Sequence, residues 1–133
     1  MIKINNNRWK YRFVEFQKSL KNLKKGLSIK SPDEIYRAGI LQLFEVSLEL
    51  CWKTLKDYLD SEGYNINSPR QVFQQAFSSG IISDGREWLE ALETRNLIAH
   101  TYDENGIVEI EKQIRKKYIK LLKKFSSNFK KLI

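Results

Sequence analysis

The sequence has very little of several residue types on which common protein chemistries depend. It contains one cysteine, one histidine and two prolines among 133 residues. A single cysteine excludes an intramolecular disulfide, and cysteine and histidine nowhere occur at the spacing of a zinc site. Cys51 stands among apolar residues of a helical pattern, which is typical of a small buried side chain rather than of a nucleophile. We therefore expect no disulfide framework, no metal site and no cysteine catalysis.

Long apolar runs are also missing. No stretch approaches the ~20 apolar residues that a membrane-spanning helix requires, and the segment 1–7 lacks the apolar core of a secretory leader. With 41% hydrophobic and 30% charged residues, the composition is that of an ordinary globular protein. We expect a cytoplasmic protein without a membrane partner, folded as one domain over residues 1–133 around a single core.

The net charge of +8 is distributed unevenly. Residues 1–30 carry nine Lys and Arg against Glu15 alone, and residues 112–133 carry nine Lys and Arg with no acid, whereas residues 31–111 carry six bases and fifteen acids. If the first and last helices lie side by side, they present a continuous basic face to a polyanion such as RNA. A solvated, lysine-rich surface without a ligand explains the charge equally well.

Apolar periodicity and capping residues predict five helices. Helical spacing of apolar residues recurs from Trp9 to Leu27 and from Ile107 to Leu132. Three segments have the composition of a helix N-terminus, near residues 32, 69 and 85: Ser31-Pro32-Asp33-Glu34, Ser68-Pro69-Arg70-Gln71 and Asp84-Gly85-Arg86-Glu87. Gly80 is placed to end the helix before residue 85. No alternating strand pattern competes, so we predict an all-α fold, an antiparallel up-and-down bundle of four long helices and a short one.

The second predicted helix, Asp33 to Glu62, has two apolar faces. The stripe expected in the core consists of Leu41, Phe44, Leu48, Trp52, Leu55 and Leu59. A second stripe, Leu43, Val46 and Leu50, lies nearly opposite and requires either a central position in the bundle or a dimer interface. Glu45 and Glu49 lie one turn apart beside the core stripe, with Lys53 one turn further. They form either an ion-paired edge or a carboxylate pair that orients a catalytic cation.

Candidate chemistry is concentrated between residues 95 and 102, where four polar side chains occur together: Arg95, Asn96, His100 and Tyr102. Histidine titrates near neutral pH, and arginine holds a phosphate oxygen in a fixed fork. If the helix that begins near residue 85 continues to Tyr102, these side chains straddle its inward stripe of Trp88, Leu92 and Ala99. The cluster is then either a satisfied helix end or an Arg–His pair suited to phosphodiester cleavage.

The motif Arg95-x4-His100-x-Tyr102 resembles the signature of the HEPN superfamily, small helical bundles of prokaryotic toxin modules and RNA-processing enzymes. Further motifs in the same order resemble its nucleotidyltransferase substrate-binding branch: Phe44-Glu45-x3-Glu49-x2-Trp52-Lys53, Ser68-Pro69-Arg70, Ala76-Phe77, Gly80-Ile81-Ile82, Trp88 and Arg95-Asn96-x3-His100-Thr101-Tyr102. The resemblance covers residues 41–104, about half of the chain. The basic terminal helices match only in general character.

The resemblance implies a homodimer in which Arg95 and His100 of both subunits face each other across a cleft. It also implies a separate partner, a minimal nucleotidyltransferase. In the toxin–antitoxin branch the helical protein is a metal-independent ribonuclease, and the partner transfers AMP to the tyrosine two residues after the histidine, here Tyr102. This chain has neither a Gly-Ser loop nor an Asp-x-Asp pair to bind Mg²⁺ and a nucleoside triphosphate, so nucleotidyl transfer must come from the partner, and no cofactor is expected.

The family's mechanism assigns roles to these residues. His100 acts in general acid–base catalysis, Arg95 stabilises charge on the phosphate, and Asn96, Tyr102, Glu45 and Glu49 support them. Because one histidine cannot both accept the 2′-hydroxyl proton and protonate the leaving oxygen, a dimer supplies the second. The alternative is a non-catalytic subunit that presents a substrate to the nucleotidyltransferase, with the same Arg and His binding a phosphate. A scaffold dimer with a decayed site is the third possibility.

Overall fold

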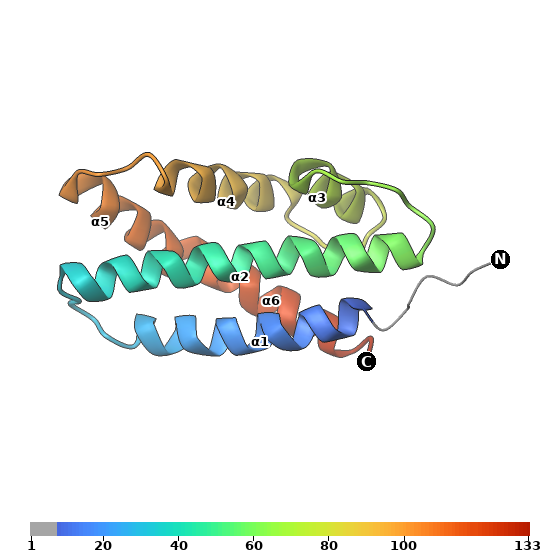
Figure 1. The fold of residues 1–133 in the computed structure, drawn as a ribbon, viewed down its shortest axis with the longest axis horizontal. Coiled ribbons are helices and arrows are strands. Elements are labelled where there is room, and N and C mark those ends of the chain that lie inside the picture. Colours follow the sequence, from blue (N-terminus) through green and yellow to red (C-terminus); the bar gives the residue numbers. More distant parts are fainter. Residues whose placement is uncertain (1–7) are drawn as a thin grey trace.

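The computed structural model describes residues 8–133, so the segment 1–7, considered above for a leader, lies outside the described residues. The elements are α1 (Arg8–Leu27), α2 (Glu34–Ser61), α3 (Pro69–Ser78), α4 (Gly85–Ile98), α5 (Glu104–Gln113), the π-helical turn η1 (Ile114–Tyr118) and α6 (Ile119–Lys130). α5, η1 and α6 follow one another without a break, so residues 8–133 form five helical rods, of which α3 is the short one. Successive long rods alternate in direction (Figure 1). The predicted all-α antiparallel bundle of four long helices and a short one is confirmed.

α2 is the central element of the bundle, with α1 on one side and α4 on the other (Figure 1). Its predicted core stripe is buried at Leu41, Phe44, Leu48, Leu55 and Leu59. Trp52 is only half-buried, because it lies at the edge of the stripe, where its indole nitrogen donates to a carboxylate of α2. Cys51 is fully buried, and desolvation raises the pKa of its thiol well above the usual value, as expected of a structural cysteine.

Aromatic side chains join the two basic terminal helices. Phe16 of α1 packs edge-on against Phe125 of α6 with ring centroids 5.1 Å apart, and Trp9 packs in the same way against Phe129 at 5.7 Å. These rings are buried and contribute to the main core. α1 and α6 therefore lie side by side, as the basic-face hypothesis requires.

Two helix boundaries follow the predicted capping rules. Ser68 accepts a hydrogen bond from the backbone N–H of Gln71 at 3.2 Å, and Pro69 occupies the first position of α3. Beyond the end of α3, Gly80 has a φ of 74°, the left-handed conformation that glycine adopts without strain.

The other two predicted caps are wrong in detail. α2 begins two residues later than predicted: Asp33, rather than Ser31, accepts from the N–H of Tyr36 at 2.8 Å, and the Pro32 carbonyl instead accepts from Arg37. At the start of α4, Asp84 lies at the N-cap position, but its side chain makes no capping bond. Its carboxylate pairs with Lys124 of α6 at 2.9 Å, so a contact distant in sequence replaces the local cap.

The turn between α1 and α2 is held by a nearly buried carboxylate. Glu111 of α5 accepts from Arg37 Nε at 2.6 Å and from Arg115 Nε at 2.7 Å. The remaining nitrogens of Arg115 donate to the carbonyls of Leu27, the last residue of α1, and of Ile29 in the turn after it. Burial alone raises the pKa of Glu111, but the hydrogen bonds and charges of the two arginines outweigh it and the pKa is lowered.

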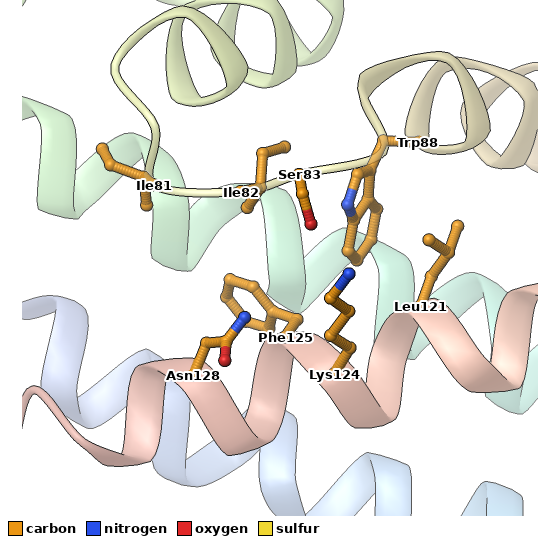
Figure 2. Close-up of a pocket in the computed structure, with 8 residues that line it drawn as sticks. All are labelled: Ile81, Ile82, Ser83, Trp88, Leu121, Lys124, Phe125 and Asn128. Atoms are coloured by element: carbon orange, nitrogen blue, oxygen red, sulfur yellow. The ribbon is translucent and has the colours of Figure 1, made fainter.

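A small cavity lies where the segment before α4 crosses α6. Figure 2 shows Ile81, Ile82 and Ser83 beside Trp88, with Phe125 below them. Its volume of about 10 Å³ matches roughly one water molecule, so it cannot hold a nucleotide. Within residues 8–133, no helix is both long and apolar enough to cross a membrane.

Candidate functional site

The centre of the candidate site is an ion pair between the two helices that carry the predicted residues. Arg95 of α4 donates through Nη2 to Glu49 Oε2 of α2 at 2.5 Å. The same oxygen accepts from the indole nitrogen of Trp52 at 2.9 Å, and Oε1 lies 3.3 Å from Lys53 Nζ. The side chains of Arg95 and Glu49 are 31% and 30% exposed, so the pair is shielded by the bundle but open to a ligand.

Glu49 remains ionised at neutral pH. Burial raises its pKa, but the hydrogen bond from Trp52 and the charges of Arg95 and Lys53 outweigh that effect, and the pKa is lowered. A permanently charged carboxylate fixes the orientation of the guanidinium. Glu49 forms the predicted i,i+4 ion pair with Lys53 and also pairs with Arg95. Within residues 8–133, the contact to Arg95 comes from Glu49 alone, so the expected pair of carboxylates, Glu45 with Glu49, is not formed around it.

Arg95 has donors to spare. A guanidinium carries five N–H groups. One is directed at Glu49 and one, from Nη1, at Asn96 Oδ1 at 3.3 Å, which leaves three without a protein acceptor in residues 8–133. These N–H groups match the geometry of phosphate oxygens.

His100 lies just beyond the end of α4, where the predicted helix to Tyr102 is wrong. α4 ends at Ile98, and the N–H of His100 donates to the Leu97 carbonyl at 3.0 Å. Thr101 closes the turn by donating its hydroxyl to the same carbonyl at 2.8 Å. The helix ends here because the chain must turn to begin α5, which is capped by Asp103. The predicted inward position of Ala99 depended on a continuous helix and is therefore wrong. Ala99 faces solvent instead of the core.

One groove nevertheless brings most of the predicted residues together. Glu45, Arg95, Asn96, Ala99 and His100 line a hollow of about 420 Å³. A neighbouring hollow of about 350 Å³ shares two of these residues and adds Gln42, Val46, Glu49 and Leu50. The shared residues, Glu45 and Arg95, make the two hollows one continuous groove. We call it the Arg95–His100 groove.

Two predicted supporting residues are placed differently from the others. Glu45 lines the groove but makes no ion pair with another residue of the range 8–133. Tyr102 lies outside the groove's lining and is 84% exposed, with its hydroxyl donating to the Ala99 carbonyl at 3.2 Å. The expectation that Tyr102 lies on the same helix as Arg95, beside its inward stripe, is wrong, because α4 has already ended at Ile98.

The groove has an apolar border. Val46 of α2 lines the groove and is 40% exposed, and Leu50 lines it beside Val46 and is half-buried. Leu43, one turn before Val46, is half-buried as well. Val46, Leu43 and Leu50 form the second apolar stripe of α2 that the sequence predicts. No element in residues 8–133 fully covers it.

Trp52 is a site residue that the sequence analysis assigned only to the core. Its position three residues after Glu49 is the available signal, because residues at i and i+3 are neighbours on a helix. For metals, residues 8–133 contain no cluster of three or more His, Cys, Asp or Glu side chains arranged to hold an ion.

Comparisons with known proteins agree with this arrangement. The family described as "Nucleotidyltransferase substrate binding protein like" matches residues 11–131. A curated protein named "Probable ribonuclease HepT", from Haemophilus influenzae, is 29% identical over 82 residues, a match that covers 58% of this chain and 56% of the relative. The chain thus matches little more than half the length of that relative. Because the family match extends over nearly the whole chain, the protein belongs to the nucleotidyltransferase substrate-binding protein family of the HEPN superfamily.

Proposed function

We propose that this protein is a metal-independent endoribonuclease whose active site is built from Arg95 and His100 at a dimer interface. The observation that carries the proposal is the Arg95–His100 groove. There an arginine held by Glu49 keeps free donors beside an exposed histidine. The curated relative's name, "Probable ribonuclease HepT", supports the same activity.

The reaction is an internal transesterification. A neutral imidazole of His100 takes the proton of the ribose 2′-hydroxyl, and the 2′-oxygen attacks the adjacent phosphorus. The bond from phosphorus to the 5′-oxygen breaks, and that oxygen takes a proton from a second, protonated histidine. The products are a 2′,3′-cyclic phosphate and a 5′-hydroxyl. Arg95 stabilises the charge that develops on the phosphate oxygens, and the amide nitrogen of Asn96 donates to the same group.

A second copy of the chain supplies the second histidine. The chain contains only one, and a single imidazole cannot act as base and acid in the same step. The exposed side chain of Val46, which lines the groove together with Leu50, supports an interface at this position. In such a dimer the two grooves face each other and form one site with two Arg–His pairs.

The partner in this proposal is a minimal nucleotidyltransferase that silences the ribonuclease. It transfers AMP to Tyr102: the phenolic oxygen attacks the α-phosphorus of ATP, and pyrophosphate leaves. The high exposure of Tyr102 supports its role as the acceptor, and the family description supports the partner. The added phosphate competes with RNA for Arg95 and brings bulk to the mouth of the groove.

RNA cleavage in EDTA tests the proposal. Purified protein whose Tyr102 is shown by mass spectrometry to be unmodified is incubated with RNA, and the product ends are analysed. We expect 2′,3′-cyclic phosphate ends from the wild type and a loss of at least 100-fold in His100→Ala and Arg95→Ala, within the ~10²–10⁴-fold range of acid–base catalysis. Arg86→Ala, an exposed arginine at the start of α4, is the matched control and should cleave normally. Cleavage that survives in His100→Ala contradicts the assignment.

Mixed dimers test the shared site. Wild-type chains are refolded with an excess of His100→Ala chains, so that most wild-type chains pair with a mutant. If both histidines act in one site, activity per wild-type chain falls toward zero. Activity that remains proportional to the amount of wild-type chain shows instead that each subunit works alone.

The second candidate is a non-catalytic subunit that presents a phosphate-containing substrate to the nucleotidyltransferase. The family's description favours it, and the free donors of Arg95 suit phosphate binding without cleavage. It predicts no RNA cleavage by unmodified wild type, together with nucleotide binding that is lost in Arg95→Ala. The same preparations and variants therefore decide between the two functions.

A further inference from the structure

The hollow between the two terminal helices is lined by exposed lysines of both. Lys24 of α1 and Lys123 of α6 line a common hollow between these helices. Lys21 lies one turn before Lys24, and Lys120 and Lys116 precede Lys123 at helical spacing. All five are exposed. We call these five residues the lysine face.

The structure separates these lysines from the cations that stabilise the fold. Arg12 of α1 pairs with Asp57 of α2. Lys117 of η1 pairs with Glu90 of α4, and Lys124 of α6 pairs with Asp84, the residue before α4. None of the five residues of the lysine face forms an ion pair within residues 8–133. The acids that contact α1, η1 and α6 in these pairs are thus bound by other cations, and the five lysines are left without an acidic partner in the part of the chain that the structure describes.

A concentration of unpaired positive charge is suited to a polyanion. Five neighbouring ammonium groups repel one another and raise the local potential, which attracts phosphates and is relieved when they bind. Lysine contacts phosphate as a point charge, without the planar fork that reads bases. The composition of the face therefore indicates backbone binding with little sequence preference.

The lysine face lies away from the Arg95–His100 groove. For the α1 part of the face, α2 lies between α1 and α4 in the bundle (Figure 1). The η1–α6 part packs against α4 through Lys117 and Glu90, but no residue of the range 8–133 lines both the hollow of the lysine face and the groove. With ~8–10 Å between packed helix axes, the path from one surface to the other is on the order of 20 Å. A stacked strand advances ~3.4 Å per nucleotide, so roughly six nucleotides are needed to reach from one to the other.

We propose that the lysine face binds the phosphate backbone of RNA and that its ligands are strands long enough to extend also to the Arg95–His100 groove. The choice of RNA as the polyanion rests on the proposed ribonuclease function. The binding surface itself rests on the placement of the lysines. The protein therefore selects substrates by length, and the face strengthens binding without taking part in the chemistry.

The test is binding of fluorescein-labelled polyuridine, with strands of about 20 and about four nucleotides chosen to lie on either side of the span estimated above. Fluorescence anisotropy is measured on His100→Ala protein, which keeps the RNA intact. The variant Lys24→Gln/Lys123→Gln is compared with Arg70→Gln/Arg86→Gln. The control pair removes the same charge from exposed positions of α3 and α4. Thermal unfolding confirms that both variants fold.

For the long strand, we expect the lysine variant to bind roughly tenfold more weakly at low salt, with a log–log salt slope smaller by about 1.4, or 0.7 per lost phosphate contact. The arginine control should stay within about twofold, as expected of cations that touch no phosphate. Binding of the short strand should be equal in the two variants.

Three results overturn the inference. Equal losses in both variants show a general effect of net charge, no loss in the lysine variant shows that RNA does not touch this face, and an equal effect on the short strand shows that the face and the groove are not spanned. If RNA does not bind there but an acidic protein competes for the lysines, the face is a protein-docking surface. Cleavage by the wild type is measured separately, so failure of the ribonuclease proposal and failure of this inference are distinguishable.

Discussion

Two arginine–glutamate sites in this bundle use the same chemical groups in opposite ways. Glu111 is 8% exposed and bridges two arginines, and the nitrogens of Arg115 are all directed at Glu111 or at backbone carbonyls. Glu49 is 30% exposed and holds Arg95, whose remaining donors face a groove. The first site is saturated and the second is not.

The difference shows how to separate structure from function at an ion pair. A buried pair in which every guanidinium nitrogen already has an acceptor contributes to the fold, and it is costly to break because the remaining charge stays in a poorly solvated place. A half-exposed pair contributes little to stability, since water competes with it. Its value lies in holding a charged group in one orientation for a ligand.

The largest effect is expected at the saturated site. Glu111→Gln keeps the shape of the side chain but leaves Arg37 and Arg115 without their counter-charge, so the free energy of unfolding should fall by about 2–4 kcal/mol. Urea denaturation measures it. Glu109→Gln, an exposed position on the same helix, should change it by less than about 0.5 kcal/mol. If the two variants have the same free energy of unfolding, Glu111 does not stabilise the turn between α1 and α2.

Glu49→Gln should show the reverse profile. Stability should fall by about 1 kcal/mol or less, because the pair is partly exposed. RNA cleavage should fall by about tenfold, since Arg95 loses the charge that orients it. Glu93→Gln is the control: Glu93 is an exposed carboxylate of α4 that does not line the groove, and the cleavage rate of this variant should stay within about twofold of wild type. Glu49→Asp, which keeps the charge, should recover part of the activity. A Glu49 role that is purely structural predicts loss of stability and activity together.

Much of the fold follows from local signals in the sequence. The buried stripe of α2, the Ser68 cap and the glycine after α3 all depend on residues within one or two turns. Such features are set by helical periodicity and by backbone hydrogen bonds near a helix end, so the sequence predicts them.

The features that the sequence could not predict depend on distant partners. Asp84 gives up its capping role because Lys124, 40 residues away, takes its carboxylate. The motif residues were located, but the partner of Arg95 was left open, since Glu49 lies 46 residues earlier. The end of α4 was missed because no glycine or proline follows Ile98, and the turn instead depends on Thr101 and on the cap of the next helix.

The turn between α4 and α5, which carries His100, allows a test with a smaller expected effect. A Cβ on Gly106 would lie 2.7 Å from Thr101 Cγ2 and 3.0 Å from Asp103 Oδ1, whereas a Cβ on Gly39 meets nothing within 4 Å. Gly106→Ala should therefore weaken the α5 cap, lower the free energy of unfolding by about 1 kcal/mol and shift the loop that carries His100, with a loss of cleavage. Gly39→Ala should raise the free energy of unfolding by about 0.5–1 kcal/mol, because alanine favours the helix. Equal effects of the two substitutions in urea denaturation would contradict the close packing at Gly106.

The smallest expected effect is on the free energy of unfolding at acid pH, and it ranks Glu111 and Glu49 by their contribution to stability. Folding lowers the pKa of both Glu49 and Glu111, each against an opposing effect of burial, from an unfolded value of about 4.3. The stability that each ionised group contributes is therefore complete above that unfolded value and is lost as the pH falls through the lower folded pKa. Urea denaturation should show that the free energy of unfolding of the wild type declines below about pH 4. This decline should be smaller in Glu111→Gln. In Glu49→Gln it should be reduced by less, under about 1 kcal/mol, because the Arg95 pair is more exposed. If the acid decline in the free energy of unfolding is reduced more in Glu49→Gln than in Glu111→Gln, the comparison is reversed. The pair in the groove, rather than Glu111 at the α1–α2 turn, is then the main electrostatic support of the fold.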